Sequence, residues 1–155
     1  MTARTTAFAL PAAATALVVG ALTATAAPAA ADGGAFQPVY SLAQGACAAQ
    51  LDTSVTGDAY PEHAAFTVST IMFGVGPCTL PVTLNWRNLD TGATGSVTQT
   101  ANGPGHWMND GRSALFHPGI GRFTATVTVG AAHVPEPGSV DFTVTEYRGV
   151  NAGIR

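Results

Sequence analysis

The stretch from Cys78 to Thr100 alternates apolar and polar residues, and it restricts the possible fold more than any other part of the chain. Apolar side chains recur at every second position, namely Leu80, Val82, Leu84 and Trp86. This period of two is typical of a strand with one buried face. Asp90-Thr91-Gly92 favours a turn, and a turn centred on Thr91 and Gly92 would place Val97 opposite Trp86. The segment therefore predicts a β-hairpin that begins at a cysteine.

The rest of the chain predicts further short strands and no helix. Alternating or β-branched runs separated by Gly and Pro give seven predicted strands, counted from Gln50: 50–56, 64–73, the two strands of the hairpin within 78–100, 113–116, 123–129 and 140–145. Residues 36–42 form a weaker extended segment, because Pro38 favours an edge position. We therefore expect an all-β fold, a single sandwich of about seven antiparallel strands over residues 50–147, preceded by an N-terminal arm or edge strand at 32–49.

Two details of this pattern resemble immunoglobulin-like and fibronectin type III-like domains. Trp86 on the third strand stands where that family places its core tryptophan, and residues 119–125 have the spacing of the turn into its sixth strand. The chain departs from the family at two positions, since Phe123 lacks the hydroxyl of a tyrosine corner and Ala125 replaces an inter-sheet cysteine. The resemblance implies an architecture and carries no function.

The first thirty-one residues have the pattern of a secretory signal peptide. Arg4 precedes an apolar run from Ala7 to Leu22, and small residues at 29–31 suit cleavage after Ala31, with Ala29 as the alternative. A membrane anchor is the other interpretation, but Pro11 and the many Ala and Thr residues make the run short and mildly apolar for a span. We expect a secreted, extracellular product with a C-terminal tail at 148–155 and no membrane insertion after cleavage. The absence of Lys and the abundance of Ala and Gly suggest a high-GC bacterial genome.

Charge argues against a nucleic-acid partner. Without residues 1–31 the chain keeps five arginines against nine acidic residues, a net charge of −4. Binding to nucleic acid or to an anionic membrane requires clustered Lys and Arg, which this chain lacks. The remaining 124 residues suit one domain with one core.

The two cysteines, Cys47 and Cys78, predict one structural disulfide. A redox-active pair is the alternative, but the C-x-x-C spacing is missing. In the expected sandwich, the first and third strands start at the same end, so the residues just before them are neighbours. The loop-entropy model gives the bridge about 3–4 kcal/mol of stabilisation.

Three predicted loops, at 74–77, 101–111 and 130–138, should gather at the disulfide end of the sandwich. Loops at one end of a rigid sandwich are common recognition sites. They carry the residues that we take as candidate binding residues, on the hypothesis that this loop cluster contacts a partner: His106, Trp107, Met108, Asp110, His133 and Glu136. The alternative is that Trp107 folds back and caps the core, which a small sandwich also needs.

Metal binding and catalysis have little support in the sequence. The four histidines, His63, His106, His117 and His133, do not have the spacing of a metal motif, and only His106 and His133 lie on loops expected together, with Asp110 or Glu136 as possible third ligands. Neither Ser96 nor Ser113 lies in a nucleophile elbow. We therefore predict no catalytic residue, no metal and no cofactor.

The sequence leaves three classes of function open. We expect a secreted, non-enzymatic binding protein whose partner is another protein or a component of the cell envelope. A carrier of a small apolar ligand is the first alternative, and its ligand would lie among four residues: Phe73, Trp107, Met108 and Phe116. An enzyme of unrecognised type is the second. A carrier predicts an apolar pocket, a binding module predicts an exposed apolar patch, and an enzyme predicts titratable groups in a cleft.

Overall fold

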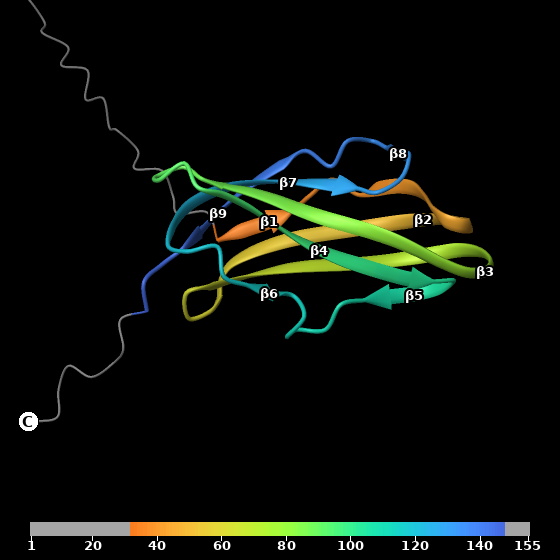
Figure 1. Cartoon of the computed structure of the whole chain (residues 1–155), viewed down its shortest axis with the longest axis horizontal. Helices are drawn as coiled ribbons and strands as arrows, with labels where there is room; N and C mark the ends of the chain where they lie inside the picture. Colours follow the sequence, from red (N-terminus) through yellow and green to blue (C-terminus); the bar gives the residue numbers. More distant parts are fainter. Residues whose placement is uncertain (1–31, 148–155) are drawn as a thin grey trace, which may run out of the picture.

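A computed structural model describes residues 32–147, so the predicted signal peptide and C-terminal tail lie outside the described residues. These residues contain strands and turns and no helix (Figure 1). The strands follow in the order β1 (Gly33–Ala35), β2 (Val39–Tyr60), β3 (His63–Asn88), β4 (Thr94–Gly103), β5 (Gly105–Met108), β6 (Leu115–Phe116), β7 (Gly121–Val129), β8 (His133–Val134) and β9 (Ser139–Val144).

Strand β3 organises the sheet because it takes part in two layers. Residues 63–75 pair with β2, β5 and β6, whereas residues 78–88 pair with β4 and β7, apart from Thr79, which also pairs with Gln44 of β2. Figure 1 shows β3 reaching one end of the molecule, bending there and running back. We call β1, β2, the first part of β3, β5 and β6 the β2 half, and the second part of β3, β4, β7 and β9 the β7 half.

The two halves also approach each other on the side where β9 runs beside β1 and β2. Asp58 on β2 accepts hydrogen bonds from the backbone N–H and the hydroxyl of Thr145, both at 2.8 Å. Gly57 lies against the Thr143 carbonyl, where a Cβ atom has no space. The strands therefore form one continuous sheet that closes nearly into a barrel.

The predicted all-β class is confirmed, and the predicted sandwich of seven strands is not. The described residues form nine strands in one sheet. Part of the difference arises because β2 continues through the predicted N-terminal arm, where Val39 is buried in the common core. Residues 74–77, predicted as a loop, belong to β3, so the predicted strand 64–73 and the first strand of the hairpin are one strand. Three additional short strands, β1, β5 and β8, are held by pairing with a longer strand.

Aromatic side chains from four strands meet in the core. The Phe123 and Phe142 rings stack with their centroids 4.9 Å apart, which joins β7 to β9. Phe142 contacts Phe116 of β6 edge-on at 6.2 Å, and this contact links the two halves. Trp86 is partly buried and packs edge-on against Phe123 at 5.7 Å, so its predicted place against the core is confirmed. Such pairs stabilise beyond the area that they bury.

The predicted hairpin forms, but its register differs from the prediction by two residues. Trp86 lies opposite Gly95, and Val97 lies opposite Leu84. The reason is Asn88, whose side-chain oxygen accepts hydrogen bonds from the N–H groups of Asp90 and Thr91, at 2.9 and 3.0 Å. Because of these hydrogen bonds, the turn is centred on Asp90 and Thr91 and not on Thr91 and Gly92.

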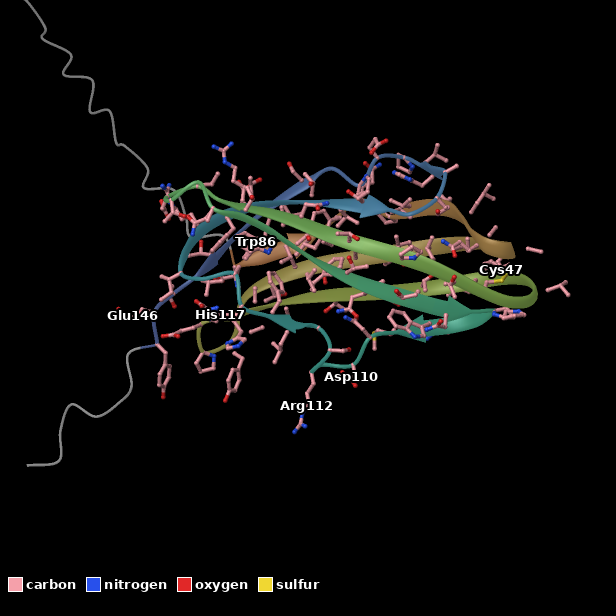
Figure 2. All side chains as sticks on the ribbon, in the orientation of Figure 1. Cys47, Trp86, Asp110, Arg112, His117 and Glu146 are labelled. Atoms are coloured by element: carbon pink, nitrogen blue, oxygen red, sulfur yellow. A yellow bond between two sulfur atoms is a disulfide. The ribbon has the colours of Figure 1, made fainter. Side chains whose placement is uncertain are left out.

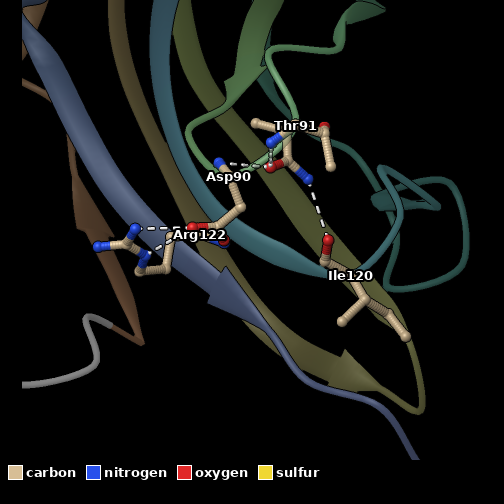
Figure 3. A network of polar contacts seen from close by, with 5 residues as sticks. Asp90, Thr91, Ile120 and Arg122 are labelled. Carbon is tan, nitrogen blue, oxygen red and sulfur yellow. Dashed lines mark hydrogen bonds and ion pairs between the residues drawn. The ribbon is translucent and has the colours of Figure 1, made fainter.

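Asp90 ties the hairpin turn to the start of β7 (Figure 3). Its carboxylate accepts hydrogen bonds from the Arg122 backbone N–H at 2.8 Å and from the guanidinium at 2.6 and 3.0 Å. The Arg122 side chain and backbone hold the pKa of Asp90 below its ordinary value. Asn88 donates to the Ile120 carbonyl at 3.0 Å and so joins the same network.

The predicted disulfide between Cys47 and Cys78 is confirmed, with the Cα atoms 6.2 Å apart. It lies at the end of the molecule where β3 bends, as the position of Cys47 shows (Figure 2). The chains approach so closely here that a side chain on Gly74 would meet the Ala46 carbonyl and the Cys47 sulfur. The glycine-rich bend and the disulfide therefore belong to one close contact between β2 and β3.

The outward face of the β7 half carries neutral polar side chains at most positions. The Thr83 and Thr98 hydroxyls are hydrogen-bonded at 2.8 Å across β3 and β4. Asn85 donates to the Thr128 hydroxyl at 2.9 Å across β3 and β7. This face satisfies many of its own polar groups and remains open to water.

Candidate functional site

An open groove of about 430 Å³ with a mainly apolar lining lies on the β2 half. The groove is lined by two stretches of β2, one at its start and one at its middle. Phe73 of β3, strand β8 and Ala132 complete the lining. The residues that line it are Tyr40, Ser41, Leu42, Ala48, Ala49, Gln50, Phe73, Ala132, His133 and Val134.

One wall of the groove is built by the start of β2 and by β8. Along β2, Val39, Ser41 and Ala43 point into the core, so Tyr40 and Leu42 point outward. Val134 lies opposite Tyr40 in the antiparallel pair. The Leu42 N–H donates to the Ala132 carbonyl at 3.0 Å and extends this pairing.

The other wall comes from the middle of β2 and from β3. Phe73 lies opposite Ala48, and both are exposed. Between the walls, β2 shifts register near Gly45, whose φ of 97° an L residue rarely adopts. A Cβ atom at Gly45 would also lie 2.7 Å from the Pro77 carbonyl oxygen. The irregularity separates the two stretches of β2 that line the groove.

The groove is a candidate site because large apolar side chains remain exposed around it. Val134, Phe73 and Tyr40 keep 68%, 65% and 60% of their surface accessible. Single exposed apolar residues are common on proteins, but a contiguous group typically marks an interaction surface. The exposed Ile71 lies two residues before Phe73 on the same face of β3 and extends this surface.

His133 lines the groove, and its imidazole ring lies close to the carboxylate of Glu136. Its Nδ1 donates to the Ala131 carbonyl at 2.8 Å, since a carbonyl oxygen can only accept. Its Nε2 lies 3.6 Å from a carboxylate oxygen of the exposed Glu136. His133 is therefore held by the loop before β8 and turned toward Glu136, so these two predicted site residues lie together.

The other predicted site residues lie elsewhere. His106, Trp107 and Met108 form β5, which pairs with β3, while β8 pairs with β2, so β2 and β3 separate the two groups. Met108 and His106 are exposed, and Trp107 is half-buried against the core. Trp107 therefore lies in a paired strand and not in the predicted loop, and its half-buried side chain leaves both the cap and the binding anchor open.

Asp110 lies in the connection between β5 and β6, away from the disulfide end that Cys47 marks (Figure 2). Its carboxylate accepts a hydrogen bond from the Ser113 N–H at 2.7 Å, which lowers the pKa of Asp110 below its ordinary value. This bonding is typical of a turn-forming Asp. The structure therefore does not bring the six predicted binding residues into one cluster.

Histidine pairing occurs where the sequence did not indicate it. The His63 and His117 rings lie edge to face with centroids 5.0 Å apart, because His63 precedes the pairing of β3 with β6 and His117 follows it. Within residues 32–147, no group of three or more His, Cys, Asp or Glu side chains could hold a metal ion. The same residues include no helix long and apolar enough to span a membrane.

Comparisons with models of protein families, with characterised proteins and with solved structures find no match for this chain. The candidate site is therefore described from its own geometry.

Of the residues that line the groove, only Phe73 and His133 were predicted to take part in binding, and Phe73 was predicted to lie in a different cluster. A signal was nevertheless present. Phe66, Val68 and Met72 share the buried face of β3, whereas Ile71 and Phe73 share the opposite face. Tyr40 and Leu42 likewise alternate with buried residues on β2. A strand that is apolar on both faces at its exposed end predicts a surface patch.

Proposed function

We propose that this chain is a secreted, non-enzymatic β-sandwich protein of the immunoglobulin-like kind, which binds a protein or a cell-envelope component through the apolar groove. The observation that carries the proposal is the set of exposed side chains around the groove, above all Tyr40, Phe73 and Val134. Covering such side chains stabilises a complex by about 25 cal/mol per Å² of apolar surface before the costs of association. Export agrees with the disulfide, which forms and persists in oxidising compartments.

The openness of the groove favours a large partner over a small ligand. Ligand pockets usually bury about 70–90% of a bound small molecule. Here the apolar walls themselves remain mostly accessible, so a small molecule lying between them would keep much of its surface in water. Apolar side chains that project from a larger partner fit this shape, because the surrounding contact area also excludes water.

A carrier of a small apolar ligand remains the second candidate, because the groove volume of about 430 Å³ falls in the range of about 300–1,000 Å³ for ligand pockets. Such a ligand would contact Leu42 and Phe73, and not the cluster around Trp107 that the sequence suggested. Solvent extraction of the purified protein followed by mass spectrometry distinguishes the two. A carrier releases a stoichiometric apolar compound, and the partner-binding protein does not.

A fluorescent apolar probe, 8-anilinonaphthalene-1-sulfonate, tests whether the groove is the binding surface. Leu42→Ser and Leu89→Ser form a matched pair, since these leucines are 59% and 49% exposed and only Leu42 lines the groove. We expect Leu42→Ser and Phe73→Ser to weaken probe binding by about threefold to tenfold and Leu89→Ser to leave it unchanged. Equal effects of Leu42→Ser and Leu89→Ser would exclude the groove.

The same variants test the biological partner. Capture from culture filtrate and envelope fractions should recover a component with the unmodified protein and with Leu89→Ser, and lose it with Phe73→Ser. If the Phe73→Ser variant still captured the component and the Trp107→Ala variant did not, the binding site would lie at β5 and not at the groove.

A further inference from the structure

Two strand edges of the sheet lie near the segment that connects β4 to β6. One is the outer edge of the first part of β3, and the other is the outer edge of β4. Only the edge of β3 is paired with other segments. In the β2 half, β5 and β6 pair with parts of the edge of β3. Between them, Asn109 donates to the Phe66 carbonyl at 2.8 Å and accepts from the Val68 N–H at 2.9 Å. The Phe66 N–H donates to the Ala114 carbonyl at 2.8 Å. The edge of β3 therefore has partners from Ala64 to Met72.

The edge in the β7 half is β4, and it has no such cover. Strand β4 is ten residues long and pairs with β3 on one side. Across residues 32–147, no second strand pairs with it, and its outer edge makes no backbone hydrogen bond to a neighbouring segment. The nearest connection is reached only by a side chain, where Gln99 donates to the Ser113 carbonyl at 2.6 Å.

Burial along β4 agrees with an open edge. Of its inward side chains, Ala101 is fully buried but Val97 and Gln99 are only half-buried, whereas the inward residues of the central strand β7, such as Phe123 and Ala125, are fully buried. An open edge presents a row of N–H and C=O groups to which another strand can bond.

The usual barriers to strand addition are missing from β4. Native edge strands carry charged residues, Pro or β-bulges that prevent pairing with another chain. Residues 94–103 contain no charged residue and no Pro, and their pairing with β3 runs without a register shift. Thr and Val, which favour strands, occupy half of the positions from 94 to 101.

We propose that β4 is a self-association edge, at which β4 of a second copy of this chain adds in antiparallel orientation about a two-fold axis. A strand without charges meets no like-charge repulsion when it faces itself, and antiparallel backbone hydrogen bonds are self-complementary. Thr94, Ser96, Thr98 and Thr100 all lie on the outward face, so the pairing would continue the hydroxyl row that begins with the bond between Thr83 and Thr98. Each copy would also cover the half-exposed Val97 of the other.

Sedimentation velocity of the purified protein over a range of concentrations tests this inference. We expect the fraction of dimer to grow with concentration. We also expect Thr98→Lys to raise the dissociation constant by about tenfold or more, because it places two like charges on the shared edge. Thr126→Lys is the matched control: Thr126 is exposed on the same face but lies on β7, which pairs on both sides. The Thr126→Lys variant should have a dissociation constant within about twofold of that of the unmodified protein.

Cysteine cross-linking locates the axis. Both cysteines of the chain are in the disulfide, so an added one has no thiol competitor. In a two-fold antiparallel pair only the residue nearest to the axis faces itself, so one of Ser96→Cys, Thr98→Cys and Thr100→Cys should form an intermolecular disulfide rapidly, and Thr126→Cys should not.

Two results would overturn the inference. One is a protein that stays monomeric at every concentration. The other is a dimer that Thr98→Lys leaves intact and Phe73→Ser abolishes, since that dimer would form through the groove and not through β4. Neither result bears on whether the groove binds the probe, so the proposed function is tested separately.

Discussion

Asn109 shows how one side chain can replace a stretch of backbone. It is buried, its amide bonds to the Phe66 carbonyl and the Val68 N–H, and its own N–H donates to the Val68 carbonyl at 3.2 Å. These bonds give the backbone groups of Phe66 and Val68 partners where neither β5 nor β6 pairs with β3. The side-chain amide of Asn109 therefore attaches the connection from β5 to β6 to the edge of β3, where a paired strand would otherwise do so.

Replacing Asn109 by Ala should destabilise the protein by about 2–6 kcal/mol, because it leaves a buried N–H and a buried C=O without partners at about 1–3 kcal/mol each. Urea unfolding followed by tryptophan fluorescence measures the change. Asn102→Ala is the control, since Asn102 is exposed and makes only a local bond to the Thr100 carbonyl. Equal losses in the two variants would contradict the role of Asn109.

Thr70 is the opposite case, a buried residue whose hydroxyl has no hydrogen-bond partner among the described residues. Thr70→Val has nearly the same shape and removes the unpaired polar group, so it should stabilise the fold by about 1 kcal/mol. A rise in the urea midpoint at unchanged m-value checks this. A variant less stable than the parent would show that the hydroxyl is bonded in solution.

Among the elements, the turn between β3 and β4 is fixed by its contact with the start of β7. Asn88 sets the turn from within, and Asp90 connects it to Arg122. Because the folded state holds the pKa of Asp90 low, the carboxylate stabilises the fold above its unfolded pKa of about 3.9 and loses that effect as the pH falls through the folded value.

Asp90→Asn should therefore lower the urea midpoint at pH 7 and have little effect near pH 2. Unfolding curves at several pH values give the comparison. Asp52→Asn serves as the control, because Asp52 is exposed and has no hydrogen-bonding partner in the described part of the chain. If both variants show the same dependence on pH, the contact with Arg122 is not the cause.

The elements also show how far the sequence determines the structure. Alternation predicts the second part of β3, β7 and β9 correctly, because each has one buried face. It does not predict β5 or β8, which are too short to show a period and depend on partners distant in sequence. The register error at Trp86 arises because Asp90 and Asn88 both favour turns, and only the bonding of Asn88 decides between them. The groove was missed because its side chains come from the exposed positions of two strands and a loop.

At the scale of the whole molecule, β3 and the disulfide hold the two halves together. The strand is covalently continuous through the bend, and Cys47–Cys78 joins β2 to the second part of β3. The predicted pairing of these cysteines is correct although neither precedes a strand: Cys47 lies within β2 and Cys78 within β3, and the bend of β3 brings the two residues together.

Cys47→Ala/Cys78→Ala should lower the free energy of unfolding by about 3–4 kcal/mol, since the bridge closes a segment of 31 residues in the unfolded chain. Thermal and urea unfolding measure the loss. Val75→Ala, an 85% exposed position in the same bend, controls for local packing. A loss under about 1 kcal/mol would show that the bend is held by its strand pairing alone.

The neutral outward face of the β7 half has a consequence for the medium in which the protein works. Hydration of that face depends on hydroxyl and amide groups, and dissolved ions screen only charges. Residues 32–147 contain a single pair of arginine and carboxylate groups in contact, that of Arg122 and Asp90. At salt concentrations where charge screening is the main effect, changes of ionic strength should therefore alter the stability of the protein very little.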